Sequence, residues 1–140
     1  MSNTQAVSGI MKQVALAAVV DGKTLKAALY LTSATTNGSN TAYTATGEVS
    51  GTNYSAGGVS VTNGNAAGLT STTAYWTPSA SITYTTVTLS TAFDAVMIYS
   101  TTDANRNLGV FTFGSQTITA GTFTLTMPTN DSSTALIRFA

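Results

Sequence analysis

The sequence predicts an all-β fold, an antiparallel β-sandwich with a single helix at its N-terminal end. Short apolar or alternating segments recur along the chain, separated by turn signals at intervals of about eight to twelve residues. Threonine is the commonest residue, followed by alanine, serine and glycine, and this composition suits the solvent faces of strands and the turns between them. The spacing leaves a jelly roll and an immunoglobulin-like sandwich open. The absence of cysteine excludes an immunoglobulin domain with its Cys-Trp-Cys pattern.

The chain divides into an N-terminal helix or arm, residues 1–22, and a single β-sandwich domain, residues 23–140. We expect the helix to run over residues 4–20 and to stop at Asp21-Gly22, because apolar residues recur there at the i, i+3, i+4, i+7 spacing of an amphipathic helix. The stripe indicates either a helix that covers one end of the β-core or an arm that docks on a partner subunit. Its members are Val7, Ile10, Met11, Val14, Ala17 and Ala18.

The expected strands follow Thr24. Alternation slips by one residue at Thr85-Thr86, which predicts a β-bulge. The segment Ala95–Tyr99 is apolar throughout, which predicts a central strand buried on both faces. The predicted strands are residues 26–31, 59–61, 69–76, 81–89, 95–99, 108–113, 117–119, 122–127 and 136–139.

The composition excludes several classes of function. Without histidine or cysteine, no Ser-His-Asp triad, Cys-His pair, disulfide or thiolate metal site can form. We therefore expect no enzyme activity, no catalytic residues, no metal and no cofactor. Five basic residues against five acidic ones, with no basic run, argue against nucleic-acid binding, and the apolar run from Val14 to Val20 is too short to span a membrane. A charged fraction of 7% and a net charge of zero predict a protein that works packed against other subunits.

A glycine-rich stretch, residues 46–59, predicts an ordered crossing between strands. Glycines accept positive φ angles and close backbone approach, and here they are interspersed with apolar anchors. We expect Gly57 and Gly58 to allow the turn, Tyr54 to pack the crossing down, and Glu48 to tie it to the frame.

Isolated charges in so uncharged a chain tend to be paired or placed at contacts. Glu48 and Arg106 are such charges. We expect each to anchor a loop through hydrogen bonds to backbone groups, with a bridge between subunits as the alternative.

Two groups of polar residues are candidates for a binding or catalytic site. Asp103, Asn105 and Asn107 have the spacing that starts an EF-hand loop, but the required glycine and the final acidic residue are missing. This pattern therefore favours a solvated hairpin turn over a calcium site. Glu48 and Asp94 are candidates for the paired carboxylates of a glycosidase. The chain has only five acidic residues, so any two of them would stand out as a pair, and the pairing is weak support for a catalytic site.

Three aromatic residues were also considered as a sugar-binding platform. They are Tyr54, Trp76 and Tyr84. Aromatic residues at strand positions belong more often to a core, so the core is the expected place for them.

Several segments in order resemble a family of small virion proteins of tailed bacteriophages, most closely the jelly-roll capsid cement, or decoration, proteins of short-tailed phages. The resemblance covers nearly the whole chain. The residues that carry it are 26–30, 46–58, 100–106, 121–125 and 135–138.

This resemblance implies a jelly roll without catalysis or cofactor that forms a homodimer or another homo-oligomer. It implies the major capsid protein as partner, a location on the capsid exterior of the virion and synthesis in the host cytoplasm. It carries over no contact residue. The alternative function is a tail-fibre or head-spike adhesion module that binds host glycan.

Overall fold

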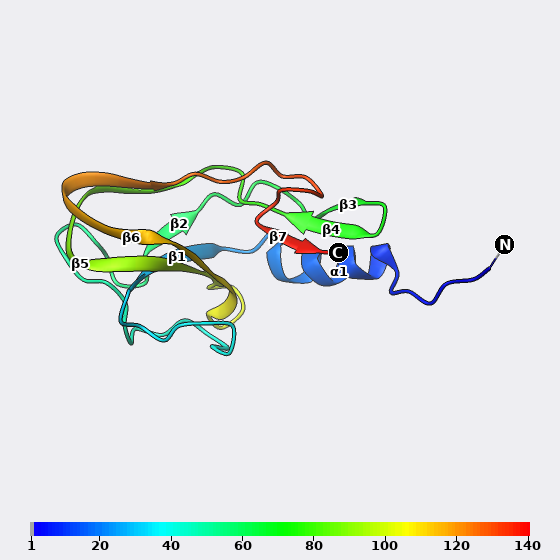
Figure 1. The fold of residues 1–140 in the computed structure, drawn as a ribbon, viewed down its shortest axis with the longest axis horizontal. Helices are drawn as coiled ribbons and strands as arrows, with labels where there is room; N and C mark the ends of the chain where they lie inside the picture. The colour runs from blue at the N-terminus through cyan, green and yellow to red at the C-terminus, as the bar shows by residue number, and fades with distance from the viewer. Residues whose placement is uncertain (1) are drawn as a thin grey trace.

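The computed structural model describes residues 2–140, in which one helix accompanies two antiparallel sheets (Figure 1). The chain is thus mostly β-structure, as predicted. The elements are α1 (Gly9–Val20), β1 (Leu25–Leu31), β2 (Val59–Val61), β3 (Gly68–Thr70), β4 (Thr73–Trp76), β5 (Ile82–Ser100), β6 (Arg106–Leu125) and β7 (Ile137–Phe139).

The four-stranded sheet has the order β2-β1-β5-β6, and the three-stranded sheet has the order β3-β4-β7. All strand pairs are antiparallel. The single strand predicted at residues 69–76 is a tight hairpin instead, because Ser71 adopts a φ of 55° and turns the chain between β3 and β4. A left-handed residue of this kind is uncommon outside glycine and asparagine, so the sequence did not mark the turn.

The long hairpin of β5 and β6 dominates the fold. The predicted breaks between strands 81–89 and 95–99, and among the three strands of residues 108–127, are absent, since β5 and β6 each run through without a loop. Register shifts take the place of the loops, and the one predicted at Thr85-Thr86 is confirmed between Tyr84 and Val87. Serine and threonine connectors are compatible with extended backbone, and each bulge bends the strand.

This bend folds the hairpin over the core (Figure 1). The ring of Phe93, in the middle of β5, lies 5.1 Å from that of Phe123 near the end of β6. The hydroxyl of Tyr84 donates a hydrogen bond of 2.8 Å to the carbonyl of Ala27 on β1. The predicted central strand Ala95–Tyr99 is buried along its whole length, which confirms that both of its faces are covered.

The helix is shorter than predicted and presents the opposite face to the sheet. It begins at Gly9 rather than Thr4, where the chain first packs closely: a methyl group at Gly9 would lie 2.8 Å from the carbonyl oxygen of Ser71. Its buried residues are Leu16 and Val20. Packing of the whole stripe on the β-core, the first of the two alternatives, is therefore wrong, because Val7, Ile10, Met11 and Val14 are 52%, 58%, 53% and 62% exposed. Ala17, from the same stripe, does pack against the core.

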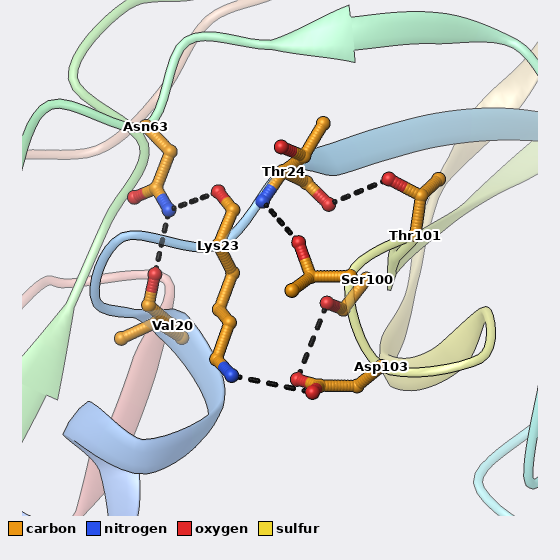
Figure 2. A network of polar contacts seen from close by, with 8 residues as sticks. Val20, Lys23, Thr24, Asn63, Ser100, Thr101 and Asp103 are labelled. Atoms are coloured by element: carbon orange, nitrogen blue, oxygen red, sulfur yellow. Dashed lines mark hydrogen bonds and ion pairs between the residues drawn. The ribbon is translucent and has the colours of Figure 1, made fainter.

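A polar network fixes the end of the helix to the β-structure (Figure 2). The side chain of Asn63 donates to the carbonyls of Val20, at 2.6 Å, and Lys23, at 3.0 Å. The ammonium group of Lys23 forms an ion pair of 3.2 Å with Asp103 in the turn between β5 and β6. Thr101 donates to the carbonyl of Thr24 at 3.1 Å. Helix, first strand and long hairpin are thus joined at one point.

Candidate functional site

The glycine-rich crossing lies directly against β1. Gly57 and Gly58 have φ angles of 91° and 80°, in the region that favours glycine. A methyl group at Gly58 would lie 1.7 Å from the carbonyl oxygen of Ala27. The expected role of both glycines is confirmed. Gly57 needs glycine for its positive φ angle, and Gly58 needs it for its positive φ angle and for its close approach to the backbone of β1.

The carboxylate of Glu48 is the centre of the crossing. One of its oxygens accepts a hydrogen bond of 2.8 Å from the hydroxyl of Tyr54 and one of 2.7 Å from the backbone N–H of Gly57. The other oxygen accepts a bond from the hydroxyl of Tyr43. The hydroxyl of Tyr54 also accepts from the N–H of Leu29 at 3.0 Å. Glu48 therefore ties the crossing together, as predicted, and Tyr54 connects it to β1.

Further tyrosines surround this carboxylate. The hydroxyl of Tyr99 donates to the carbonyl of Gly57 at 2.7 Å, and that of Tyr30 donates to the carbonyl of Thr44 at 2.6 Å. The rings of Tyr43 and Tyr99 stack with their centroids 4.8 Å apart. We call Glu48 and these surrounding tyrosines the tyrosine cluster; its members are Tyr30, Tyr43, Glu48, Tyr54, Tyr84 and Tyr99.

Burial and the nearby negative charge keep these phenols protonated. Desolvation, followed by the charge of Glu48, raises the pKa of Tyr30 to about 12. Desolvation likewise raises the pKa of Tyr43, Tyr54, Tyr84 and Tyr99, with Glu48 adding to it. Neutral phenols that donate hydrogen bonds are structural groups rather than nucleophiles. The cluster thus anchors a loop.

Sequence reasoning named Glu48 and Tyr54 but missed Tyr30, Tyr43 and Tyr99. A signal was present: these positions carry tyrosine, whose hydroxyl needs a partner when buried. Tyr43 bonds to Glu48, five residues away, whereas Tyr30 and Tyr99 bond to the backbone carbonyls of Thr44 and Gly57. Tyr99 and Gly57 are far apart in the sequence, so only the fold shows that they meet.

Arg106 does not anchor a loop through its side chain. It is exposed at the start of β6, and within residues 2–140 its guanidinium makes no ion pair or hydrogen bond. Its backbone pairs with Ala42, and its N–H donates to the carbonyl of Asp103 at 3.1 Å. The predicted side-chain anchor is wrong here because the turn is held by backbone groups.

The other sequence candidates are used structurally. Trp76 and Tyr84 are 0% and 1% exposed, so they form core with Tyr54, whose ring stacks on Tyr84 at 6.0 Å, and not a platform on the surface. Asp103 is bonded to Lys23 and Ser100. Over the described part of the chain, no group of three or more acidic residues is placed to hold a metal ion.

Two uncovered apolar features remain on the surface. The first is the helix stripe, which we define as Val7, Ile10, Met11 and Val14. The second is a cavity of about 180 Å³ beside β6. Its lining is almost entirely apolar and consists of Ile82, Val96, Ile98, Phe111, Thr112, Phe113, Leu125, Thr126, Met127, Pro128 and Leu136.

Comparison with protein-family models, curated proteins and solved structures finds no match to this chain. In residues 2–140 no helix has the length and apolar character that crossing a bilayer would require. The candidate site must accordingly be judged on its own geometry.

Proposed function

We propose that this protein is a structural component of a virion, a capsid cement or decoration protein of jelly-roll type that binds the outside of a phage head and holds neighbouring major capsid subunits together. The observation that carries the proposal is the helix stripe. Four apolar side chains, each more than half exposed, lie close together in the chain: Ile10, Met11 and Val14 share one face of α1, and Val7 comes just before its N-cap. Another face of α1 packs on β3 and β4. An amphipathic helix of this kind binds by laying its apolar face into a groove on a partner.

The charge distribution supports a permanent partner. The net charge is zero, and the helix stripe has one basic neighbour, Lys12, whose ammonium group bonds to the carbonyl of Thr72 at 3.1 Å. The side chains of the stripe are all apolar, so contact with a protein surface is more favourable for them than contact with water. A shell offers the same surface many times, so a modest contact at each copy gives strong overall retention.

The tyrosine cluster supports the same function in a different way. It holds a long irregular segment rigid through hydrogen bonds to a single carboxylate, without placing reactive groups on the surface. A rigid frame with few charged groups suits assembly better than catalysis. The support from the sequence is the resemblance to phage cement proteins described above.

Binding to isolated phage shells tests the proposal. We expect the purified protein to sediment with shells assembled from the major capsid protein alone, and the double variant Ile10→Asp/Val14→Asp to remain in the supernatant. The matched control is Thr83→Asp/Thr85→Asp, which adds the same two charges at exposed positions of β5 and should leave binding unchanged. Equal sedimentation of the stripe variant and the control would contradict a role for the stripe.

Copy number separates this function from the adhesion alternative. A cement protein should be present at on the order of hundreds of copies per virion, whereas a tail or spike module should be present at a few tens or fewer. Quantitative gel densitometry of purified virions measures this number. A count in the low tens would exclude the cement function.

A further inference from the structure

The outer edge of β6 is uncovered along most of its length. β6 is the last strand of the four-stranded sheet. At its start the loop before the crossing covers it, since Asn107 donates to the carbonyl of Thr41 at 3.1 Å and Tyr43 donates to that of Asn105 at 2.8 Å. From Leu108 to Leu125, the described chain provides no backbone partner other than β5. Apart from the C=O of Gly114 and the N–H of Ala120, which bond to the side chains of Gln116 and Thr88, a row of N–H and C=O groups without partners therefore faces outward.

The register identifies which residues present these groups. On β1, Leu29 and Leu31 bond to the segment Gly47–Val49, on the side away from β5. Backbone groups of successive residues point to opposite sides of a strand. Ala28 therefore bonds toward β5, where its partner is Met97.

The same alternation continues through the sheet. Since Met97 bonds toward β1, its neighbour Val96 bonds toward β6, where its partner is Phe111. No register shift interrupts this part of the ladder. Val110 and Thr112, on either side of Phe111, are left with their N–H and C=O groups directed away from the sheet.

No charged side chain or proline protects this edge, and its bulges lie on either side of the regular segment of residues 109–112. Exposed edge strands are normally kept apart by charged side chains, proline, bulges or a covering segment. Between Asn107 and Leu125 there is no proline and no charged residue, and a methyl group at Gly114 would meet no atom within 4 Å. Phe111 and Phe113 are half-buried and line the cavity on the same side. The edge and the cavity mouth form one uncovered region.

We propose that two copies of this chain pair β6 with β6 in antiparallel orientation, across a two-fold axis near Thr112. The free backbone groups require an extended partner. The other edge strands of the two sheets, β2, β3 and β7, have three residues each, so only β6 of a second copy offers a strand of matching length.

The charges of the chain permit this arrangement. In an antiparallel pair centred at Thr112 the two Arg106 side chains lie about 40 Å apart, at 3.4 Å per residue, and no like charges meet. A stable interface buries about 1,200 Å² or more in total. The strand pair would contribute to this area together with the cavity walls around Phe111 and Phe113.

The dimer and the proposed binding to a shell involve different elements. The helix stripe belongs to α1, which packs on β3 and β4, whereas the dimer uses the edge of the other sheet. The purified chain alone tests the dimer, so failure of one proposal leaves the other standing.

Sedimentation velocity of the purified full chain provides the test, with Thr112→Pro as the disrupting variant. Proline removes an outward N–H and leaves the ladder to β5 intact. Losing this bond from both copies should raise the dissociation constant of the dimer about 30-fold. Thr112→Ser keeps the N–H and serves as the control, with an unchanged dissociation constant. A wild-type chain that stays monomeric at about 100 µM, or a dimer unaffected by the proline, would overturn the proposal.

A second variant covers the case in which the proline variant does not fold. The chain has no cysteine, so Thr112→Cys carries a single thiol close to the proposed axis, and mild oxidation should cross-link it into a covalent dimer. Thr70→Cys, at an exposed position of β3 in the other sheet, is the control and should cross-link at least about tenfold more slowly. Equal rates for the two variants would also overturn the proposal.

Discussion

At the scale of single residues, Glu48 is unusual because its carboxylate is satisfied without a cation. The chain has five basic residues, and the bonds of Glu48 come from two phenols and one backbone N–H. Hydrogen bonds to a charged acceptor contribute more than neutral ones. A half-buried carboxylate bonded in this way holds three separate positions of the chain in fixed relation.

Replacing Glu48 by glutamine should lower stability by about 1–3 kcal/mol. The amide keeps one acceptor oxygen, but its NH₂ group faces a tyrosine hydroxyl or the N–H of Gly57, so at least one buried donor loses its acceptor. Urea unfolding of both proteins measures the difference. The control is Asp94→Asn, at a carboxylate with no hydrogen bond among residues 2–140, which should change stability by less than about 0.5 kcal/mol.

The protonated tyrosines predict loss of stability at alkaline pH. Tyr30 has its pKa raised to about 12, against about 10 in an unfolded chain. Below pH 10 both states keep the proton, so stability does not depend on this group. Between pH 10 and 12 the unfolded state releases the proton first, and stability falls by about 1.4 kcal/mol per pH unit.

Urea midpoints measured from pH 7 to pH 11.5 test this dependence. The other members of the tyrosine cluster have pKa values shifted in the same direction and steepen the fall. In the Tyr30→Phe variant, the urea midpoint should fall less steeply with pH above pH 10 than it does in the wild type. A wild-type midpoint that stays constant up to pH 11.5 would show that the phenols ionise in the folded protein.

At the same scale, the sequence predicted residues whose roles are local. Gly57 and Gly58 were recognisable because a dense glycine run in a loop indicates positive φ. The bond from Tyr43 to Glu48 was not recognisable, nor was the bond from Tyr99, on a distant strand, to the carbonyl of Gly57. For Arg106, the small number of charged residues suggested that its side chain forms a hydrogen bond to the backbone. The number of charges does not determine the direction in which that side chain points.

At the scale of elements, the apolar periodicity of the helix predicted which residues share a face but not which face packs on the sheet. The spacing of Ile10, Met11 and Val14 correctly placed them on one face, whereas Val7 lies before the start of the helix. The spacing did not decide which face packs on the protein's own sheet. The contact face uses Gly9, for close approach to Ser71, and polar residues such as Gln13, which donates to the carbonyl of Ala67 at 3.0 Å. Leu16 and Val20 are the buried apolar residues of this face, and this pair alone is a weaker periodic pattern than the exposed stripe.

Two N-terminal deletions should therefore behave differently. Removing residues 2–8, all exposed, should change stability by less than about 0.5 kcal/mol. Removing residues 2–20 also takes away Leu16 and Val20, both fully buried, and should cost about 3–6 kcal/mol at 1.5–3 kcal/mol for each side chain.

A loss of this size approaches the whole stability of an ordinary domain, about 5–15 kcal/mol. Circular dichroism melts and the soluble yield of both deletions measure the effect. A chain lacking residues 2–20 that melts like wild type would show that the helix is a separable arm.

The β5–β6 hairpin illustrates the limit of strand prediction. Each predicted strand in residues 81–127 falls on β5 or β6, apart from one residue at the start of this range and two at its end, and the bulge at Thr85-Thr86 was visible as a change of alternation. The expected loops between them were wrong, because serine, threonine and glycine also occur within bulged strands. The bend that brings Phe93 against Phe123 follows from long-range packing and has no local sequence signal.

At the scale of the whole molecule, scarcity of charge connects the fold to the proposed assembly. The core is stabilised by apolar burial and by hydrogen bonds, with Glu48 as its one bonded carboxylate in the crossing. The uncovered features, the helix stripe and the edge of β6, are uncharged. They belong to different parts of the structure. One copy can thus contact a second copy and a shell at the same time, an arrangement suited to linking repeated subunits.

This character predicts that stability depends little on ionic strength. The ion pair between Lys23 and Asp103, with side chains 24% and 20% exposed, is the one salt bridge in residues 2–140, and pairs near the surface contribute about 0–1 kcal/mol. We expect the free energy of unfolding to change by less than about 0.5 kcal/mol between 50 and 500 mM NaCl. Sodium sulfate should instead raise stability, because it strengthens apolar burial.

The β6–β6 dimer should respond in the same way, because no charged residue lies between Asn107 and Leu125. Its dissociation constant should stay within about twofold over the same range of NaCl concentration and decrease in sulfate. Sedimentation velocity at each salt concentration measures this. A dimer that dissociates as NaCl rises would place charged groups in the interface and exclude pairing through the uncharged edge of β6.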